Sequence, residues 1–172
     1  GENAIAALLA SREREELIAR GRGKRGLTLE QYVAQWFKDL GLIEAFRVEE
    51  IKKGTNLYRV HVQRTSSAAE VLLTDVGFGV SQILPVLVLC YYVPVGSTVL
   101  LEQPEIHLHP SVQARLADVF IDAMKVRGIQ VIVESHSEHF LRRLLRRIAE
   151  GTELTEKDAS IYFCDVQQGG TR

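Results

Sequence analysis

The strongest constraint on the fold is an alternation of apolar runs and helix-like segments in the second half of the chain. The runs STVLLEQ (97–103) and IQVIVES (129–135) are almost continuously apolar, which is typical of strands in a buried parallel sheet. Between them, Pro110 opens a segment with apolar residues at helical spacing, and Gly128 ends it. With a third predicted strand, IYFCDV (161–166), this order predicts an α/β fold with a parallel sheet.

Further helices are expected to flank this sheet. Residues 82–92 are apolar on all sides, so we expect a buried helix after the glycine-rich turn, with Pro85 near its first turn. Ser135 and Glu138 have capping-box spacing for the helix that follows the second strand. The residues expected on its core-facing side are Phe140, Leu141, Leu144, Leu145 and Ile148.

The first forty residues also predict helices. Asn3 is expected to cap a first helix whose apolar positions continue to Leu17. Thr28 and Gln31 have capping-box spacing for a second, amphipathic helix. The glycine-broken basic loop at 20–26 is expected to be solvated.

The period of the pattern then changes from helical to extended. Runs at 56–64 and 68–76 predict an antiparallel hairpin, with His61 on its polar side as a surface histidine. We therefore divide the chain into a helical lid region, residues 1–55, and a C-terminal lobe, residues 56–172.

Composition bounds the class of protein. Apolar residues make up 46% and charged residues 25%, and the net charge of -1 gives no overall attraction to nucleic acid. Cys90 and Cys164 are expected to be reduced core thiols in a cytoplasmic protein. The most apolar run, 83–93, is shorter than the roughly 18 residues that span a bilayer. The chain begins GENAI without a signal peptide or an initiator methionine, so we expect it to be part of a longer protein.

Polar residues gather where the predicted strands end. In open parallel sheets, ligands bind beyond the carboxyl ends of the strands. The first strand runs into EQPE at 102–105, the second into ESHS at 134–137, and the glycine-rich turn DVGFGVSQ occupies 75–82. Together, these three segments indicate a functional site, either a metal-dependent nucleotide site or a metal site of histidines and carboxylates.

These segments resemble the motifs of ABC-type ATPases. VLLEQPEIHLHP (99–110) resembles a Walker B strand with its D-loop, DVGFGVSQ resembles the ABC signature, and VIVESHSEHF (131–140) resembles the strand before the switch histidine. The likeness is greatest to the AAA-group branch that contains DNA-repair ATPases, overcoming-lysogenization-defect (OLD) nucleases and bacterial predicted ATPases with an uncharacterised C-terminal extension. It implies a partial P-loop-type ABC ATPase head, with the preceding region as helical lid and hairpin, and it covers roughly residues 70–165.

The resemblance implies a role for each matching residue. Glu102 would bind Mg²⁺ beside the β- and γ-phosphates of ATP. Gln103 stands where a water-activating glutamate is usual; a glutamine can orient water but cannot accept its proton. Either Gln103 orients the water or Glu105 supplies the base. His136, next to Ser135, would reach the γ-phosphate.

The signature residues would contact ATP that is held by another subunit. Backbone N–H groups at a helix N-terminus, with a hydroxyl, suit an anionic phosphate. The matching residues are Gly77, Gly79, Ser81 and Gln82, and the choice between Ser81 and Gly79 stays open because the common leucine-serine-glycine-glycine-glutamine form is not kept. His107, Leu108 and His109 fall where the D-loop would run between subunits.

No GxxxxGK[ST] phosphate-binding loop occurs in the chain. We therefore expect the C-terminal half of an ATPase head, inactive by itself. The resemblance implies that the full-length protein hydrolyses Mg-ATP in a homodimer or head-to-tail dimer, with a nuclease or DNA as a partner and no membrane.

Two other functions stay open. Histidines and carboxylates follow both strands and could form a zinc or manganese site of a metal-dependent hydrolase: His107, His109, His136, His139, Glu102, Glu105 and Glu134. The second is an ATP-gated dimerisation module with little turnover, which Gln103 favours. Four arginines of the last helix form a stripe that we expect to be solvated: Arg142, Arg143, Arg146 and Arg147.

Overall fold

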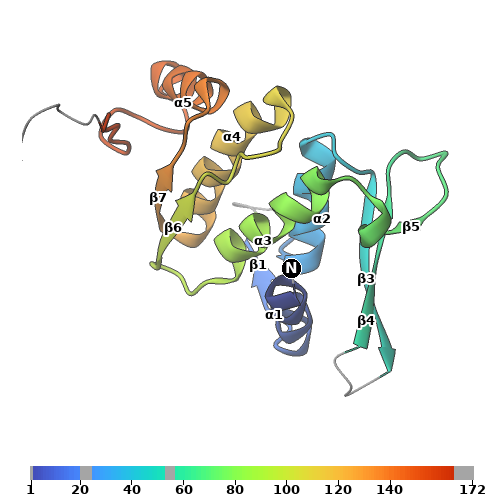
Figure 1. Cartoon of the computed structure of the whole chain (residues 1–172). Coiled ribbons are helices and arrows are strands. Elements are labelled where there is room, and N and C mark those ends of the chain that lie inside the picture. Colours follow the sequence, from blue (N-terminus) through green and yellow to red (C-terminus); the bar gives the residue numbers. More distant parts are fainter. Residues whose placement is uncertain (1, 20–24, 53–56, 165–172) are drawn as a thin grey trace, which may run out of the picture.

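The computed structural model describes residues 2–19, 25–52 and 57–164. Two parts are joined by central helices: β6 and β7 with α4 and α5 at one end, and the long β3–β4 pair at the other (Figure 1). The elements, in chain order, are α1 (Glu2–Glu13), β1 (Leu17–Ile18), β2 (Leu27–Thr28), α2 (Leu29–Asp39), β3 (Ala45–Lys52), β4 (Leu57–Gln63), β5 (Val71–Leu72), the 3₁₀-helix η1 (Leu73–Asp75), α3 (Phe78–Tyr92), β6 (Thr98–Glu102), α4 (Pro110–Arg127), β7 (Gln130–Glu134) and α5 (Glu138–Glu150).

The parallel pair β6–β7 confirms the α/β class. Thr98 lies opposite Gln130, and the two strands stay in register to their last residues. The connecting helix α4 has Pro110 in its first turn and ends at Arg127, followed by Gly128, whose φ of 59° is left-handed. The third predicted strand is wrong over 161–164, because these residues are exposed and pair with none of the described strands; 165 and 166 lie outside the described residues. Apolar side chains alone do not make a strand; pairing with a neighbouring strand is also needed.

The antiparallel sheet differs from the predicted hairpin. The main partner of β4 is β3, with Phe46 opposite Val62 and Val48 opposite Val60, and all four side chains are buried. Within the predicted run 68–76, only β5 pairs with β4, and the chain then turns into η1. The sequence AFRVEEIK of β3 is rich in charge, which hid its alternating pattern.

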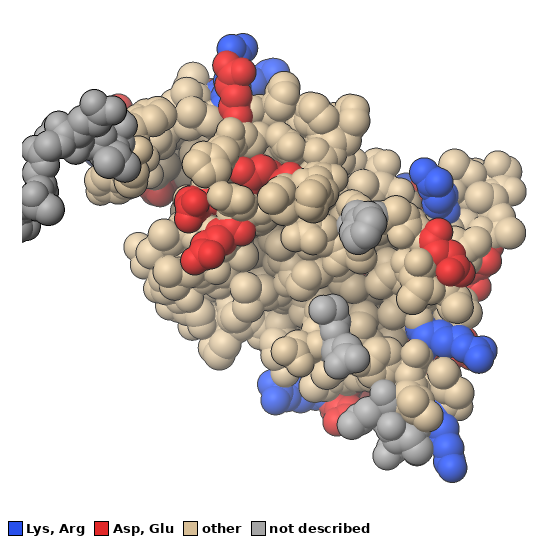
Figure 2. Space-filling model, viewed as in Figure 1, with Lys and Arg blue, Asp and Glu red and all other residues tan. Residues whose placement is uncertain are grey.

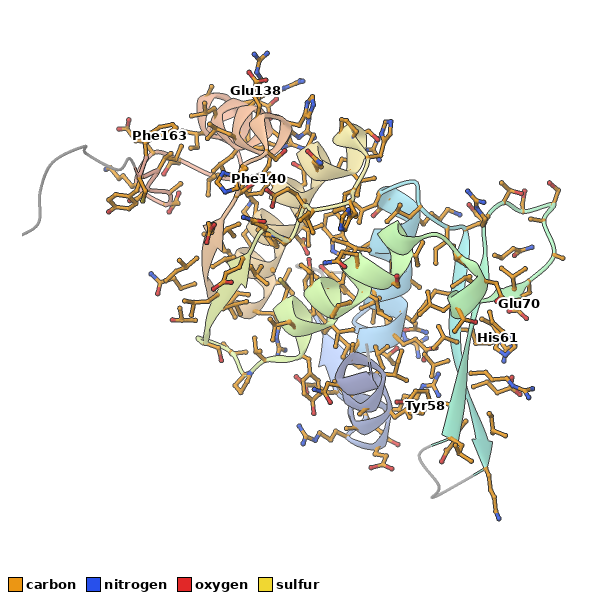
Figure 3. The ribbon with its side chains drawn as sticks, viewed as in Figure 1. Tyr58, His61, Glu70, Glu138, Phe140 and Phe163 are labelled. Carbon is orange, nitrogen blue, oxygen red and sulfur yellow. The ribbon has the colours of Figure 1, made fainter. Side chains whose placement is uncertain are left out.

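His61 of β4 lies between two carboxylates rather than alone on the surface. Its Nε2 is 2.8 Å from Glu49 and its Nδ1 is 3.5 Å from Glu70. Figure 3 shows His61 and Glu70 beside each other on this sheet. Cross-strand pairing therefore supplies the partners that neighbours in sequence could not.

The N-terminal helices follow the prediction in part. Thr28 and Gln31 form the predicted capping box of α2. Asn3 lies within α1 rather than capping it, and Leu17 belongs to β1, because the helix ends at Glu13. The predicted boundary between residues 55 and 56 falls in the connection from β3 to β4, outside the described residues, and stays a prediction.

Helix α3 forms the centre of the core. It starts at Phe78, four residues before the predicted start, so Pro85 lies in its interior rather than in its first turn. Ile83, Leu87 and Tyr91 are among its fully buried residues. Cys90 is buried as predicted, whereas Cys164 is exposed, which corrects the expectation of a core thiol. None of the described helices is long and apolar enough to cross a membrane.

Helix α5 packs on α4 through a narrower apolar face than predicted. Phe140 is buried and meets Phe120 edge-on, with ring centroids 5.8 Å apart. Figure 3 shows Phe140 on the side of α5 that faces α4, and Glu138 on its outer side. Leu145, which we expected in the core, is exposed.

Candidate functional site

Two carboxylates end the parallel strands side by side. Glu102 of β6 lies opposite Glu134 of β7, and both residues are exposed. Within the described part of the chain, the side chain of Glu102 makes no hydrogen bond or ion pair. Its oxygens are therefore free to bind a cation. In Figure 2, acidic side chains lie over β6 and β7, whereas basic ones lie toward the periphery of this view.

The chain turns sharply after β6. Gln103 donates its backbone N–H to Glu134 O at 2.9 Å, and its side-chain Nε2 lies 3.5 Å from Glu134 Oε1. Gln103 and His107 have φ of 44° and 62°, in the left-handed region that few non-glycine residues adopt. Gln113 of α4 closes the turn by donating to Leu108 O at 2.9 Å. The position of Gln103 is thus fixed by β7 and by the turn itself.

Glu105 links this turn to the loop after β7. Its side chain points inward, and the residue is only 6% exposed. Oε1 accepts hydrogen bonds from Ser135 Oγ at 2.7 Å and from the backbone N–H of His136 at 2.8 Å. Oε2 is buried and has no partner among the described residues. A carboxylate from one strand end therefore holds the backbone of the other.

The loop after β7 starts α5 differently from the prediction. The N-cap is Ser137, whose Oγ accepts from Phe140 N at 3.1 Å, and not Ser135. Ser135 Oγ donates to Glu105 and accepts from the backbone N–H of Ser137 at 3.2 Å, so it lies before the helix instead of capping it. Ser137 Oγ also donates to Gln113 Oε1 at 2.7 Å. The motif ESHS offers two serines at suitable positions, and only tertiary contacts decide between them.

A cavity of about 350 Å³ lies beyond the strand ends. Its lining residues are Gln103, Glu105, Ile106, His107, Gln113, His136 and Ser137. Three of the four predicted catalytic residues thus line one cavity, while Glu102 lies at the adjoining strand end. Sequence reasoning missed Gln113 and Ser137. The polar position of Gln113 in the first turn of α4, one turn after the motif, was the available signal.

The predicted signature residues lie at the start of α3. Gly77 is the N-cap, and the first turn contains no acidic residue and no side-chain cap. Gly79, Ser81 and Gln82 belong to the helix itself rather than to a turn before it. A Cβ on Gly79 would lie 3.9 Å from Leu108, so this turn packs near the loop that follows β6. Leu108 is itself buried within this chain.

The residues fit magnesium better than the alternative zinc or manganese centre. His109 caps α4 by accepting from Ser111 N, and its Nδ1 lies 2.8 Å from Ser111 Oγ. Among the residues that the structure describes, no three histidines, cysteines or carboxylates come together as a metal-binding group. Glu102 instead offers a carboxylate at one edge of the sheet. Mg²⁺ is usually bound through one or two carboxylates and keeps its other sites for water and phosphate oxygens.

A protein-family model matches residues 31–142, which is more than half of the chain. Its description is "AAA domain, putative AbiEii toxin, Type IV TA system". The chain belongs to this AAA family. A search of curated proteins found no match.

The fold of this AAA-family chain is similar to that of SMC ATPase heads. One solved structure comes from work on ATP-driven dimerization and DNA-stimulated activation of SMC ATPases; it has a TM-score of 0.52, 13% identity and coverage of 67% of this chain and 71% of that one. The SmcHead bound to the C-winged helix domain of ScpA has a TM-score of 0.54 and 12% identity, and the match covers 67% of this chain and 36% of that one. A third structure is the Pyrococcus furiosus Smc head with an extended coiled coil, bound to the C-terminal domain of ScpA. It has a TM-score of 0.50 and 10% identity, and the match covers 67% of this chain and 29% of that one. The match thus spans about a third of the latter two chains, and it shows an ABC-type α/β fold.

The arginine stripe of the AAA-family chain is only partly solvated. Arg143 and Arg147 turn toward α4 and both bind Asp118, with contacts of 2.8 and 2.7 Å. Arg142 and Arg146 are exposed, as predicted, and pair with glutamates of α5 itself. Half of the stripe therefore joins two helices.

Proposed function

We propose that the ends of β6 and β7 form the magnesium- and water-binding part of an ATP-hydrolysing site. One observation carries this proposal: Glu102 ends β6 beside β7, and Gln103 and His136 line a single cavity immediately beyond. A carboxylate for the metal ion, an amide for water and an imidazole for the terminal phosphate are the groups that phosphoryl transfer to water requires. Membership of an AAA family and a fold like that of SMC ATPase heads support this assignment.

Each residue has a role that its surroundings allow. Glu102, whose side chain has no partner among the described residues, would bind Mg²⁺, which neutralises charge on the phosphates when it is bound. Gln103, anchored to β7 through its backbone, would orient the attacking water. The imidazole of His136 is 78% exposed and would donate to the γ-phosphate beyond the cavity.

The phosphate-binding loop would come from another segment of the complete protein. Two observations support this proposal. The chain contains no GxxxxGK[ST] motif. In addition, Leu100 and Ile132 lie opposite each other on β6 and β7 and are 69% and 49% exposed, so one face of the parallel sheet is apolar and uncovered. A neighbouring layer on this face would bury both side chains.

The start of α3 would contact ATP of a second subunit. Its first-turn N–H groups meet no acidic side chain of their own helix, which suits a phosphate. The ATP-driven dimerization described for SMC ATPases supports a homodimer or a head-to-tail dimer here. A DNA or nuclease partner, and a place in the OLD-like and DNA-repair branch, are further proposals that rest on the motifs.

Substitution of Glu102 in the complete protein tests this function. Glu102→Gln removes the carboxylate but keeps its size, so single-turnover hydrolysis of Mg-ATP should fall by about 100-fold or more. Glu156→Gln, at an exposed glutamate in the segment after α5, is the matched control and should hydrolyse ATP like the parent. A parent without ATP hydrolysis, or equal rates in Glu102→Gln and the parent, would contradict the proposal.

Gln103 favours a second candidate, an ATP-gated dimer with little turnover, because an amide cannot take a proton from water. The same samples decide between the two. Dimerisation on Mg-ATP, measured by light scattering, with no hydrolysis over the lifetime of the complex would support this candidate.

A further inference from the structure

Two loops that are distant in sequence meet at one carboxylate oxygen. Glu105 Oε1, in the turn after β6, accepts from Ser135 Oγ at 2.7 Å and from His136 N at 2.8 Å in the loop after β7. The residue is 6% exposed, so little water competes for these bonds. Hydrogen bonds to a carboxylate are stronger than those between neutral groups. The backbone of His136 is therefore held directly by the turn that carries Gln103.

We infer that Glu105 is a positioning residue, which fixes the loop after β7 so that the imidazole of His136 is presented at the cavity. This inference rests on the proposed ATPase function. It reassigns Glu105, for which the sequence left open the role of general base.

The contacts of Glu105 oppose a role as base. A general base must lie within hydrogen-bond reach of the water whose proton it takes. Oε1 is already bonded to two donors, and Oε2 is buried away from solvent. The side chain of His136, in contrast, is exposed, while its backbone N–H is fixed. This division suits a loop whose backbone is held still and whose imidazole meets a ligand.

A second contact holds the same loop from the other side. Ser137 Oγ donates to Gln113 Oε1 at 2.7 Å, and Gln113 also donates to Leu108 O at 2.9 Å. His136 thus lies between two residues that are each tied to the segment after β6. Loss of the Glu105 contact would release the loop on one side and leave Ser137 in place.

Substitutions can separate the two possible roles of Glu105, as a hydrogen-bond acceptor that holds the loop and as a general base. Glu105→Gln keeps an oxygen that can accept from Ser135 and His136 but cannot accept a proton from water. Glu105→Ala removes both capacities. In the complete protein, Glu105→Ala should lower kcat on the order of 100-fold with a smaller change in KM for Mg-ATP, because a misplaced catalytic group chiefly costs rate. Glu105→Gln should recover most of the lost turnover. If Glu105→Gln is as inactive as Glu105→Ala, the inference is overturned and Glu105 is the base.

A measurement on this chain keeps the test independent of ATP hydrolysis. Amide hydrogen exchange at His136 should be slow in the parent and in Glu105→Gln, and much faster in Glu105→Ala. Ser135→Ala, which removes one donor and leaves the His136 N–H bond, should keep most of this protection. If the parent fails to hydrolyse ATP, the proposed function fails, while the exchange rates still decide whether Glu105 holds the loop. Equal exchange at His136 in all variants would overturn the inference.

Discussion

The hydroxyl of Tyr91 donates a 2.7 Å hydrogen bond to Asp122 and so joins α3 to α4 inside the molecule. Tyr32 of α2 donates to the same carboxylate oxygen at 2.8 Å. Burial, and then the charge of Asp122, raise the pKa of Tyr91 well above its ordinary value. Tyr91 therefore remains a hydrogen-bond donor. Three helices behind the candidate site are tied together at one carboxylate.

Tyr91→Phe should lower the free energy of unfolding by about 1–2 kcal/mol. The substitution removes one donor from a partly buried carboxylate and leaves the ring in place. Tyr92→Phe is the matched control, because the Tyr92 hydroxyl makes no hydrogen bond among the described residues. Urea unfolding of both variants measures the difference. Equal stability of Tyr91→Phe and Tyr92→Phe would show that this bond contributes nothing.

Asp118 offers a second test of how helices are held together. Its carboxylate binds Arg143 and Arg147 of α5, and these side chains are only 16%, 26% and 24% exposed. Asp118→Asn should lower the free energy of unfolding by about 1–3 kcal/mol, because two guanidinium groups lose a partly buried partner. Glu138→Gln breaks the exposed pair with Arg142 and should lower the free energy of unfolding by less than about 1 kcal/mol. Thermal and urea unfolding measure both values. If Glu138→Gln were more destabilising than Asp118→Asn, the exposed pair would contribute more than the partly buried one, and the prediction would be wrong.

The parallel strands and α4 could be predicted because their signals are local. Apolar runs, Pro110 and Gly128 mark these elements without reference to the rest of the chain. Strand β3 was missed because its identity depends on pairing with β4, which places Phe46 and Val48 in the core. Residues 161–164 likewise form no strand because they pair with none of the described strands, and Tyr162 and Phe163 there are 84% exposed.

The candidate site shows the same division between local and distant signals. That Glu102, Gln103 and His136 lie at the same edge of the sheet was predictable, because residues that follow parallel strands share one edge. The burial of Glu105 was not predictable. Carboxylates are usually exposed, and the donors that satisfy this one lie 30 and 31 residues further along the chain.

The two cysteines should differ sharply in reactivity. Burial raises the pKa of the Cys90 thiol to about 12, so almost no thiolate forms near neutral pH. Cys164 is exposed and accessible to reagents. A thiol reagent should therefore modify one cysteine rapidly in the native chain and both in denaturant. Cys164→Ser should abolish the rapid phase; rapid modification of Cys90 in that variant would contradict the buried position.

Glu150 provides a prediction about pH. Hydrogen bonds from Arg146, and then from Arg147, lower the pKa of Glu150 below its ordinary value. Its ionised form therefore stabilises the end of α5 at pH values above the ordinary pKa, and this contribution is lost as the pH falls through the lowered pKa. An NMR titration of the carboxyl group should show this lowered pKa, and Arg146→Gln should raise it toward the ordinary value. An unchanged pKa in Arg146→Gln would refute the assigned cause.

The last prediction concerns the amide at the centre of the proposed chemistry. Gln103 is held by its backbone bond to Glu134, and its side chain lines the cavity. In Gln103→Glu, a carboxylate would stand where an amide now orients water, and it could also accept the proton of that water. General-base catalysis contributes about 10²–10⁴-fold, so single-turnover hydrolysis by the complete protein should rise at least about tenfold at saturating Mg²⁺.

At low Mg²⁺ the gain should be smaller, because the new charge would lie beside Glu102 and Glu134 and needs the cation to offset their repulsion. Gln130→Glu makes the same change of charge at the opposite end of β7 and should leave the rate as it is in the parent. If Gln103→Glu hydrolyses ATP more slowly than the parent at saturating Mg²⁺, the reaction depends on a hydrogen bond that the amide donates. If the rate is unchanged, Gln103 does not contact the attacking water, and its part in the proposed site must be withdrawn.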